Sequence, residues 1–383
     1  MSFYEFHVPR RYVQCEDALL QFPKFAALIG KRVLILEMCD PVREEIEGKL
    51  RLGIATPSRE SVDPDLAAVS PRYARYVPMS ERLDALRKEM HFEFMDLGEA
   101  VVEEEGIRRV ARYVRGHHFD TVAGVGGGRA QDFARALTRF ADVRVILVPT
   151  LCATNASIST LSVLYAHDGA TIREYWRMDN APDLVLVDTS VLVRNPPQML
   201  AAGIGDIMST YCEALCNLKM TGNRDAVPDL AVEGVQLAFD LMIRRAPEAM
   251  RAVQSQRITP AFENVISMIL HNCGPLGMIC TTGFAHLLDE VFLFFDAAHR
   301  VPHGLRVGFA TIPMMRHCGL DCAAYLGMCR EVGIPIALEE MGLGGISRGE
   351  WHRACQETLG QSGNLAGLPF ALSFEELMDS LFL

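Results

Sequence analysis

The sequence predicts an α/β half followed by an all-α half. Three observations lead to this fold class: short apolar runs alternate with helical periodicities up to residue 188, three consecutive glycines lie between a predicted strand and a predicted helix, and only helical periodicities follow residue 197. Alternation of strands and helices is typical of a parallel sheet covered by helices on both faces. We therefore expect an α/β domain over residues 1–188 and a helical domain over residues 189–383.

The elements of the α/β half follow from their apolar spacing. Short buried runs predict strands at 33–36, 121–125, 143–148 and 184–188. Apolar residues at helical spacing, such as Ile107, Val110 and Val114, belong to predicted helices at 41–50, 106–114 and 132–140. Residues 51–79 contain four prolines and a weak hydrophobic pattern, which predicts an inserted excursion after the first helix. A lid, an oligomer arm and a plain surface loop are all open interpretations of it.

The second half contains five long helical periodicities. They predict helices at 199–217, 232–243, 260–270, 281–295 and 305–315.

Composition narrows the class of protein. A chain of 383 residues with 50% hydrophobic and 22% charged residues is globular and long enough for two cores. The net charge of −11 repels phosphate backbones, so we expect no nucleic-acid partner. Eleven cysteines without a CxxC pair favour a reducing cytoplasm over a disulfide framework. The sequence lacks a signal peptide and a membrane-spanning run, and we expect a cytoplasmic homo-oligomer.

The glycine triplet Gly126, Gly127 and Gly128 precedes a helix that opens near Ala130. Glycine allows positive φ and lets backbone N–H groups approach a pyrophosphate, while the helix N-terminus adds partial positive charge. The triplet matches neither GxGxxG nor a Walker loop. Its context favours a phosphate cradle, with a purely structural turn as the alternative. Glu37, at the end of the first strand, could accept from a ribose diol and favour NAD over NADP, or could be a solvated carboxylate at a helix start.

One carboxylate and two histidines form a candidate metal set. Asp206 lies at the start of the predicted helix in AAGIGD, His286 lies within an apolar helix, and His303 lies just before another helix. One carboxylate oxygen and two imidazole nitrogens leave an open position on a divalent metal, as catalytic zinc requires. An aspartate at a helix start is also a common cap, and the spacing alone does not decide between these roles.

Five stretches carry a family resemblance. Four are GVGGGRAQDFAR at 124–135, PTLCATNASISTLSVLY at 149–165, NAPDLVLVD at 180–188 and AAGIGDIMSTYCEA at 201–214. The fifth, residues 283–309, keeps a 17-residue interval between two histidines. Together they span about half of the chain and resemble glycerol dehydrogenases, metal-dependent polyol and alcohol dehydrogenases related to dehydroquinate synthase.

The resemblance implies a fold, cofactors and a site. The fold is a Rossmann-like NAD domain and a helical metal domain, with a cleft between them for nicotinamide and metal. The implied metal ligands are Asp206, His286 and His303, which would also serve catalysis. The implied dinucleotide contacts are Glu37 at the ribose, Gly126, Gly127 and Gly128 at the pyrophosphate, and Thr150, Thr154, Ser159, Leu161 and Tyr165 around the nicotinamide half.

Three positions depart from the pattern. The iron-type alcohol dehydrogenases have a further histidine four residues after the aspartate, and Thr210 stands there, so the resemblance implies zinc rather than iron. Asn155 replaces an aspartate that is thought to meet the polyol hydroxyls, which makes Asn155 a candidate catalytic residue. Asp289 replaces a second histidine on the helix of His286. Because the last two changes lie beside the implied substrate, we expect the chemistry to be kept and the substrate to differ.

The resulting prediction is an NAD-dependent, metal-assisted oxidoreductase. It would interconvert a secondary alcohol, such as a polyol, hydroxy ketone, hydroxy acid or cyclitol, and its ketone. A dehydroquinate-synthase-like cyclase or lyase is one alternative, but it needs a basic cluster for phosphate, and only Arg300 and Arg306 lie near the metal motif. A catalytically degenerate NAD-binding paralogue is the other.

Overall fold

The computed structural model of the protein describes residues 8–38, 42–55, 86, 88–169, 171–272, 283–362 and 368–382. These residues form two compact units. Of the described residues, one unit contains 8–150 together with Ala156–Leu192, and the other contains Leu151–Asn155 and those from Val193 onward. Most of the excursion predicted at 51–79 lies outside the described residues.

The first unit is built on a parallel sheet. Its strands are β1 (Tyr12–Cys15), β2 (Arg32–Met38), β3 (His91–Asp96), β4 (Thr121–Gly126), β5 (Arg144–Pro149) and β8 (Leu184–Asp188), in the order β1-β8-β5-β4-β2-β3. Every neighbouring pair is parallel. The predicted α/β half is therefore confirmed, as are all four strands expected from buried apolar runs. The sequence did not predict β1 and β3, because these edge strands are only half buried and lack a continuous apolar run.

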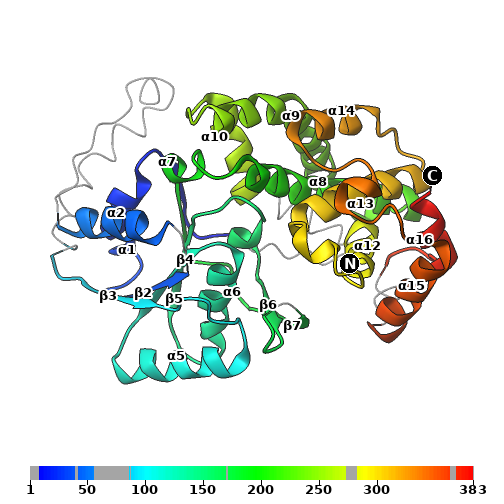
Figure 1. Cartoon of the computed structure of the whole chain (residues 1–383). Helices are drawn as coiled ribbons and strands as arrows, with labels where there is room; N and C mark the ends of the chain where they lie inside the picture. The colour runs from blue at the N-terminus through cyan, green and yellow to red at the C-terminus, as the bar shows by residue number, and fades with distance from the viewer. Residues whose placement is uncertain are drawn as a thin grey trace. The chain divides into compact units, whose positions relative to one another are not determined.

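Helices accompany this sheet (Figure 1). They are α1 (Phe22–Ala26), α2 (Arg43–Ala55), α5 (Glu104–Gly116), α6 (Gly128–Ala136) and the short α7 (Thr189–Leu192). Several expected boundaries were wrong: α2 continues to residue 55, into the predicted excursion, α5 is two residues longer at each end, and α6 spans 128–136 rather than 132–140. An antiparallel hairpin, β6 (Leu161–Tyr165) and β7 (Ile172–Arg177), forms a separate small sheet.

The second unit is helical. Its helices are α8 (Pro197–Thr221), α9 (Asp229–Gln254), α10 (Pro260–Ser267), α12 (Phe284–Phe292), α13 (His303–His317), α14 (Ala323–Val332), α15 (Arg348–Ser362) and α16 (Phe374–Ser380). The predicted helix 260–270 continues beyond α10 as a π-helical turn, Met268–Asn272. The predicted all-α half is confirmed. Within the part of the chain that the structure describes, no helix combines the length and apolar character needed to cross a membrane.

Close packing of α8 against α13 depends on two glycines. A Cβ atom on Gly205 would lie 2.1 Å from the carbonyl oxygen of Gly304, and one on Gly304 would lie 1.9 Å from that of Ala202. Real side chains cannot make such contacts, so glycine is required at both positions. The backbone of α8 therefore touches the first turn of α13, and this contact brings the residues after Gly205 close to His303.

Candidate metal centre and dinucleotide site

Asp206 does not cap a helix. It lies well inside α8 and is 4% exposed, so the capping interpretation is wrong. Its carboxylate is directed at groups from other parts of the same unit: its Oδ2 accepts from the backbone N–H of Asn155 at 2.9 Å, and its Oδ1 lies 3.4 Å from Nε2 of His303. A buried carboxylate with such partners is available for binding rather than for helix termination.

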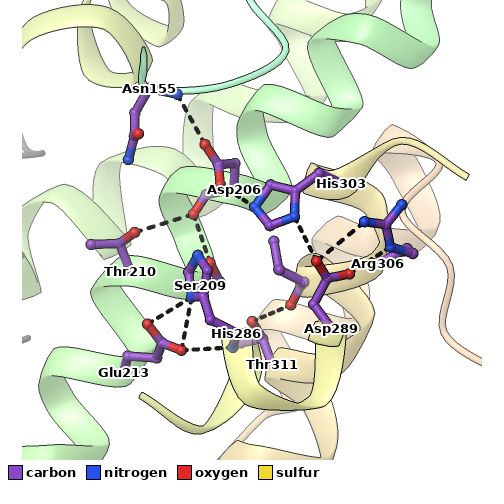
Figure 2. Close-up of polar contacts among 11 residues, drawn as sticks. Asn155, Asp206, Ser209, Thr210, Glu213, His286, Asp289, His303, Arg306 and Thr311 are labelled. Atoms are coloured by element: carbon purple, nitrogen blue, oxygen red, sulfur yellow. Dashed lines mark hydrogen bonds and ion pairs between the residues drawn. The ribbon is translucent and has the colours of Figure 1, made fainter. Parts of the chain in front are cut away.

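The structure brings the three predicted ligands together. Asp206, His286 and His303 each offer one ligand atom, and these atoms all lie within 4.8 Å of one another. His286 is on the first turn of α12, and His303 is the first residue of α13 (Figure 2). The helices α8, α12 and α13 thus each contribute one group. Among the described residues, this is the one group of three histidine, cysteine or carboxylate side chains close enough to hold an ion together.

Glu213 holds His286 from behind. The Nδ1 atom of His286 lies 2.9 and 3.0 Å from the two oxygens of the Glu213 carboxylate, and the backbone N–H of His286 donates to the same side chain at 3.0 Å. Glu213 is fully buried. This contact leaves Nε2 of His286 as the atom for a ligand, the arrangement in which a carboxylate orients a metal-binding histidine.

Asp289 holds His303 in the same way. Its Oδ2 lies 2.7 Å from Nδ1 of His303, and its Oδ1 accepts from Nε of Arg306 at 2.5 Å. Asp289 is 5% exposed and faces these two residues (Figure 2). The carboxylate of Asp289 is therefore held by a histidine and a guanidinium, and its effect on a substrate stays a prediction.

The charges of this cluster fit a divalent cation. The cluster contains three buried carboxylates, those of Asp206, Glu213 and Asp289. Among the described residues, Arg306 pairs with Asp289, and the ion pairs of the other two carboxylates contain histidines only, so these pairs supply no positive charge when both imidazoles are neutral. Burial raises the pKa of Asp206, but the two histidines and the Asn155 N–H outweigh it and hold that pKa below its usual value. Burial likewise lowers the pKa of His303, but Asp289 and Asp206 outweigh it and raise the pKa to about 10. The site therefore stabilises positive charge, which a divalent metal would supply.

Asn155 approaches the cluster through its backbone. The segment Leu151–Asn155 reaches α8 because Gly203 lacks a side chain: a Cβ atom there would lie 1.8 Å from the carbonyl oxygen of Cys152. The Asn155 N–H then contacts Asp206, while the side chain of Asn155 extends beside the cluster (Figure 2). The role of this side chain toward a substrate stays a prediction.

The residues predicted to bind the dinucleotide's ribose and pyrophosphate lie together at the carboxyl ends of β2 and β4. Glu37, the second-to-last residue of β2, pairs with Val125, and Met38 pairs with Gly126 at the end of β4. The chain passes from β2 outward to β3 and then returns to β4 on the other side, so β2 and β4 border the topological switch point where parallel sheets bind ligands. Glu37 is 2% exposed and Gly126 has φ of +151°. A Cβ atom on Gly126 would lie 2.2 Å from the carbonyl oxygen of Met38.

Gly127 and Gly128 begin the helix that follows β4. Gly127 is the N-cap of α6, and Gly128 is its first residue. The backbone N–H groups of this first turn have no partner within the helix, the arrangement that suits a phosphate. The structure thus confirms the expected position of the triplet between strand and helix, while its contact with a dinucleotide stays a prediction.

The residues predicted around the nicotinamide half fall in both units. Thr150 follows β5, and its N–H donates to the carbonyl of Gly126 at 3.1 Å. Ser159 Oγ accepts from the N–H of Leu161 at 2.9 Å, and Tyr165 ends β6. Thr154 belongs to the Leu151–Asn155 segment of the helical unit.

Four residues with evident roles were not predicted. Arg129 lies in the first turn of α6, with its guanidinium 4.9 Å from the centre of the Tyr165 ring, and so links the glycine loop to the β6–β7 hairpin. Glu213 and Arg306, with the reassigned Asp289, support the histidines. Helical spacing held the signal for these: Glu213 is seven residues after Asp206, and Asp289 and Arg306 each follow a histidine by three, which places each pair on one helix face.

Comparisons with known proteins agree with this fold. A family model described as iron-containing alcohol dehydrogenase matches residues 74–189. The chain is 27% identical over 279 residues to the glycerol dehydrogenase of Citrobacter freundii, covering 71% of this chain and 76% of that protein. It is 26% identical over 262 residues to hydroxycarboxylate dehydrogenase A of Escherichia coli K12, covering 67% and 72%. The crystal structure of glycerol dehydrogenase from Schizosaccharomyces pombe has the same fold, with a TM-score of 0.77, 19% identity, and coverage of 100% and 90%.

These relatives, together with the parallel sheet and the helical unit, indicate an NAD-dependent, metal-assisted alcohol oxidoreductase. The chain is similar in sequence to the iron-containing alcohol dehydrogenases over residues 74–189, and to glycerol dehydrogenases over about two thirds of its length.

Proposed function

We propose that this enzyme transfers a hydride between NAD and a secondary alcohol, with a divalent metal held by Asp206, His286 and His303. The observation that carries the proposal is that both histidines have Nδ1 held by a buried carboxylate, which leaves both Nε2 atoms for the metal. A metal held by these three residues would supply Lewis-acid chemistry, which favours the alkoxide of an alcohol or polarises a ketone. NAD supplies the hydride acceptor.

The chain's own residues orient the reactants. Asp206 provides a carboxylate whose second oxygen is fixed by the N–H of Asn155, so this ligand cannot swing away. His303 keeps 40% of its side chain exposed and His286 keeps 26%, so a small substrate can reach the ligand face from outside. Fixed ligands and an accessible face are the requirements of a catalytic rather than a structural metal site.

NAD is the proposed dinucleotide, rather than NADP. The buried carboxylate of Glu37, at the end of β2 and next to the glycine loop, is suited to accept hydrogen bonds from a ribose diol. It would repel a 2′-phosphate at the same place. Gly127 and Gly128 would receive the pyrophosphate at the N-terminus of α6.

Zinc is the proposed metal, rather than iron. Thr210 lies one turn after Asp206 on α8, and its hydroxyl donates to the carbonyl oxygen of Asp206 at 3.3 Å. Because residue 210 is a threonine and not a histidine, the turn after Asp206 supplies no imidazole as a fourth ligand. Three protein ligands and one open position are typical of catalytic zinc.

The proposed substrate is a hydroxy ketone, a hydroxy acid or a cyclitol rather than a simple triol. A carboxylate accepts from two hydroxyls, whereas the amide of Asn155 offers one acceptor and a donor group. A donor suits a carbonyl or carboxylate oxygen next to the reacting carbon. The relatives' names include both a glycerol and a hydroxycarboxylate dehydrogenase, so the superfamily accommodates both classes of substrate.

The phosphate-eliminating alternative is not favoured. Arg306 was one of two basic residues available for a phosphate, but its guanidinium is 6% exposed and bound to Asp289, Ala298 and Val301. A substrate phosphate would have to compete with a buried ion pair. The degenerate paralogue is not favoured either, because the complete ligand set and its supporting carboxylates are present.

We further propose a cytoplasmic homo-oligomer. The eight cysteines that the structure describes are all free thiols, which suits a reducing compartment. Leu230 and Leu237 lie seven residues apart on α9 and are 76% and 57% exposed, so that face offers apolar area to a second copy. Light scattering of the purified protein measures the oligomeric state, and a monomer at working concentration would rule out the oligomer.

A substrate screen tests the proposed activity. The purified protein, loaded with Zn²⁺, is mixed with NAD and with glycerol, butane- and propanediols, 2-hydroxy acids and cyclitols, and NADH absorbance is followed. Turnover on at least one secondary alcohol, lost on chelation and restored by Zn²⁺, is the expected result. NAD binding without metal-dependent turnover on any of these compounds, or on the matching ketones with NADH, would favour the degenerate paralogue.

A further inference from the structure

The carboxylate of Asp289 joins two residues of the next helix. Its Oδ2 lies 2.7 Å from Nδ1 of His303 and 3.2 Å from Nη2 of Arg306, and its Oδ1 lies 2.5 Å from Nε of Arg306. Both oxygens therefore accept from donors on α13, although Asp289 itself is on α12. Since His303 and Arg306 are three residues apart, both lie on the helix face that meets α12.

Arg306 is anchored at a second place. Besides Asp289, its guanidinium donates to the carbonyl oxygens of Ala298, at 3.2 Å, and of Val301. Both carbonyls belong to the segment that leads into α13, immediately before His303. Arg306 thus ties this entry segment to the Asp289 carboxylate, which also contacts His303.

These contacts fix the tautomer and the ring direction of His303. An imidazole at the first position of a helix has no neighbouring turn before it to restrict its side chain, so its direction must come from outside the helix. A hydrogen bond from Nδ1–H to a fixed carboxylate selects both the tautomer and the ring direction, and leaves Nε2 facing Asp206. Arg306 keeps that carboxylate from turning, because the guanidinium occupies both of its oxygens.

We propose that Asp289 and Arg306 act together as the positioning pair of His303, setting the affinity of the Asp206–His286–His303 centre for its metal. The proposal rests on the proposed function, since it concerns the same centre. Neither residue is a catalytic residue in this proposal, because each acts through His303 and contacts no ligand-binding atom.

The first test is Asp289→Asn. The amide cannot accept at both of its terminal atoms, so its NH2 group must face either His303 or Arg306, both of which are donors. We expect the Kd for Zn²⁺, measured by competition with a chromophoric chelator, to rise about ten- to a hundredfold. We also expect the visible absorption of the Co²⁺-substituted protein to change, since these bands report the geometry of the ligands.

A second variant keeps the test decisive if Asp289→Asn fails to fold. Arg306→Lys retains the positive charge but cannot bind two carboxylate oxygens and two carbonyls at once. We expect it to fold, to bind Zn²⁺ more weakly than wild type, and to shift the Co²⁺ spectrum in the same direction. If the two residues act as one pair, Arg306→Lys should cost little further affinity in the Asp289→Asn background.

Asp132→Asn is the matched control. Like Asp289, Asp132 is buried and paired with an arginine, here Arg135 of its own helix at 2.9 Å. Its ion pair involves no histidine, and it lies in the α/β unit. We expect this variant to lose stability without any change in Zn²⁺ affinity. A merely structural role of Asp289 would make it behave like this control.

The outcomes separate the inference from the proposed function. If folded Asp289→Asn and Arg306→Lys bind Zn²⁺ with the wild-type Kd and give the wild-type Co²⁺ spectrum, the positioning role is overturned while the metal centre stands. If the wild-type protein binds neither Zn²⁺ nor Fe²⁺, the proposed function is overturned and the inference falls with it.

Discussion

The Nδ1 atom of His286 lies 2.9 Å from Oε1 of Glu213, a residue seven positions after Asp206 on α8. A spacing of seven places Asp206 and Glu213 on one face of the helix, two turns apart. One helix thus supplies both a candidate metal ligand and the carboxylate that orients a second ligand on α12. Figure 2 shows His286 between these two side chains.

Removal of Glu213's charge should weaken the metal centre. In Glu213→Gln we expect the Kd for Zn²⁺ to rise about ten- to a hundredfold, because the neutral amide orients His286 less firmly and stabilises less positive charge. Chelator competition measures this change. An unchanged Kd in a folded variant would remove Glu213 from its role, and Glu248→Gln, at a half-exposed carboxylate on α9, is a control with no expected effect on Zn²⁺.

Loss of either histidine ligand should empty the site. His286→Ala and His303→Ala should each retain far less Zn²⁺ after dialysis than the wild-type protein, since two remaining ligands hold a divalent ion weakly. Elemental analysis of the dialysed proteins is the measurement. Substitution of His299, a surface histidine whose ring contacts the carbonyl of Leu293, should leave the metal content unchanged. Equal metal in all of these proteins would refute the assignment.

The choice of dinucleotide should depend on Glu37. We expect NAD to bind at least about tenfold tighter than NADP, a difference of about 1.4 kcal/mol. Glu37→Gln should reduce the difference between the two affinities, because it weakens the binding of NAD and removes the repulsion of a 2′-phosphate. Fluorescence titration with NADH and NADPH gives both dissociation constants, and equal values in the wild-type protein would contradict the role of Glu37.

Glycerol should be a poor substrate, and Asn155→Asp should improve it. A carboxylate at this position restores two acceptors for hydroxyls, and a charge-assisted hydrogen bond contributes roughly 1.5–3 kcal/mol, or about ten- to a hundredfold in kcat/KM. Steady-state kinetics with glycerol compare the two proteins. The idea would be abandoned if the variant gained nothing, or if wild-type efficiency with glycerol already matched the best compound of the screen.

The contact between α8 and α13 should tolerate no side chain at Gly205. In Gly205→Ala the new methyl group would meet the carbonyl of Gly304 at 2.1 Å, so the helices must separate, at a cost of about 1–3 kcal/mol or more in the free energy of unfolding. Gly327→Ala, in α14 with open space around the new methyl, should stabilise the protein by about 0.5–1 kcal/mol. Urea denaturation measures both changes, and similar values for the two variants would show that the close contact is unimportant.

The sequence by itself determined the class of fold and the three candidate ligands. Buried strands are predictable from the sequence because both faces of a parallel sheet are covered. Thr121–Gly126 and Leu184–Asp188 therefore form nearly continuous apolar runs. The edge strands Tyr12–Cys15 and His91–Asp96 lack this signal because they are partly exposed. The ligands were found through a family resemblance rather than through their spacing, because they come from three separate helices.

Only the tertiary structure decided which charges support the centre. The local sequence around Asp206 is compatible with a helix cap. The structure excludes this role because α8 begins at Pro197, nine residues earlier. The family resemblance singled out Asp289 only as a changed charge beside the implied substrate, and the structure shows that its carboxylate binds His303 and Arg306. The physical reason is that a side chain's partner across a helix interface depends on the packing of two helices. That packing depends in turn on contacts such as Gly205 against Gly304, which no local pattern records.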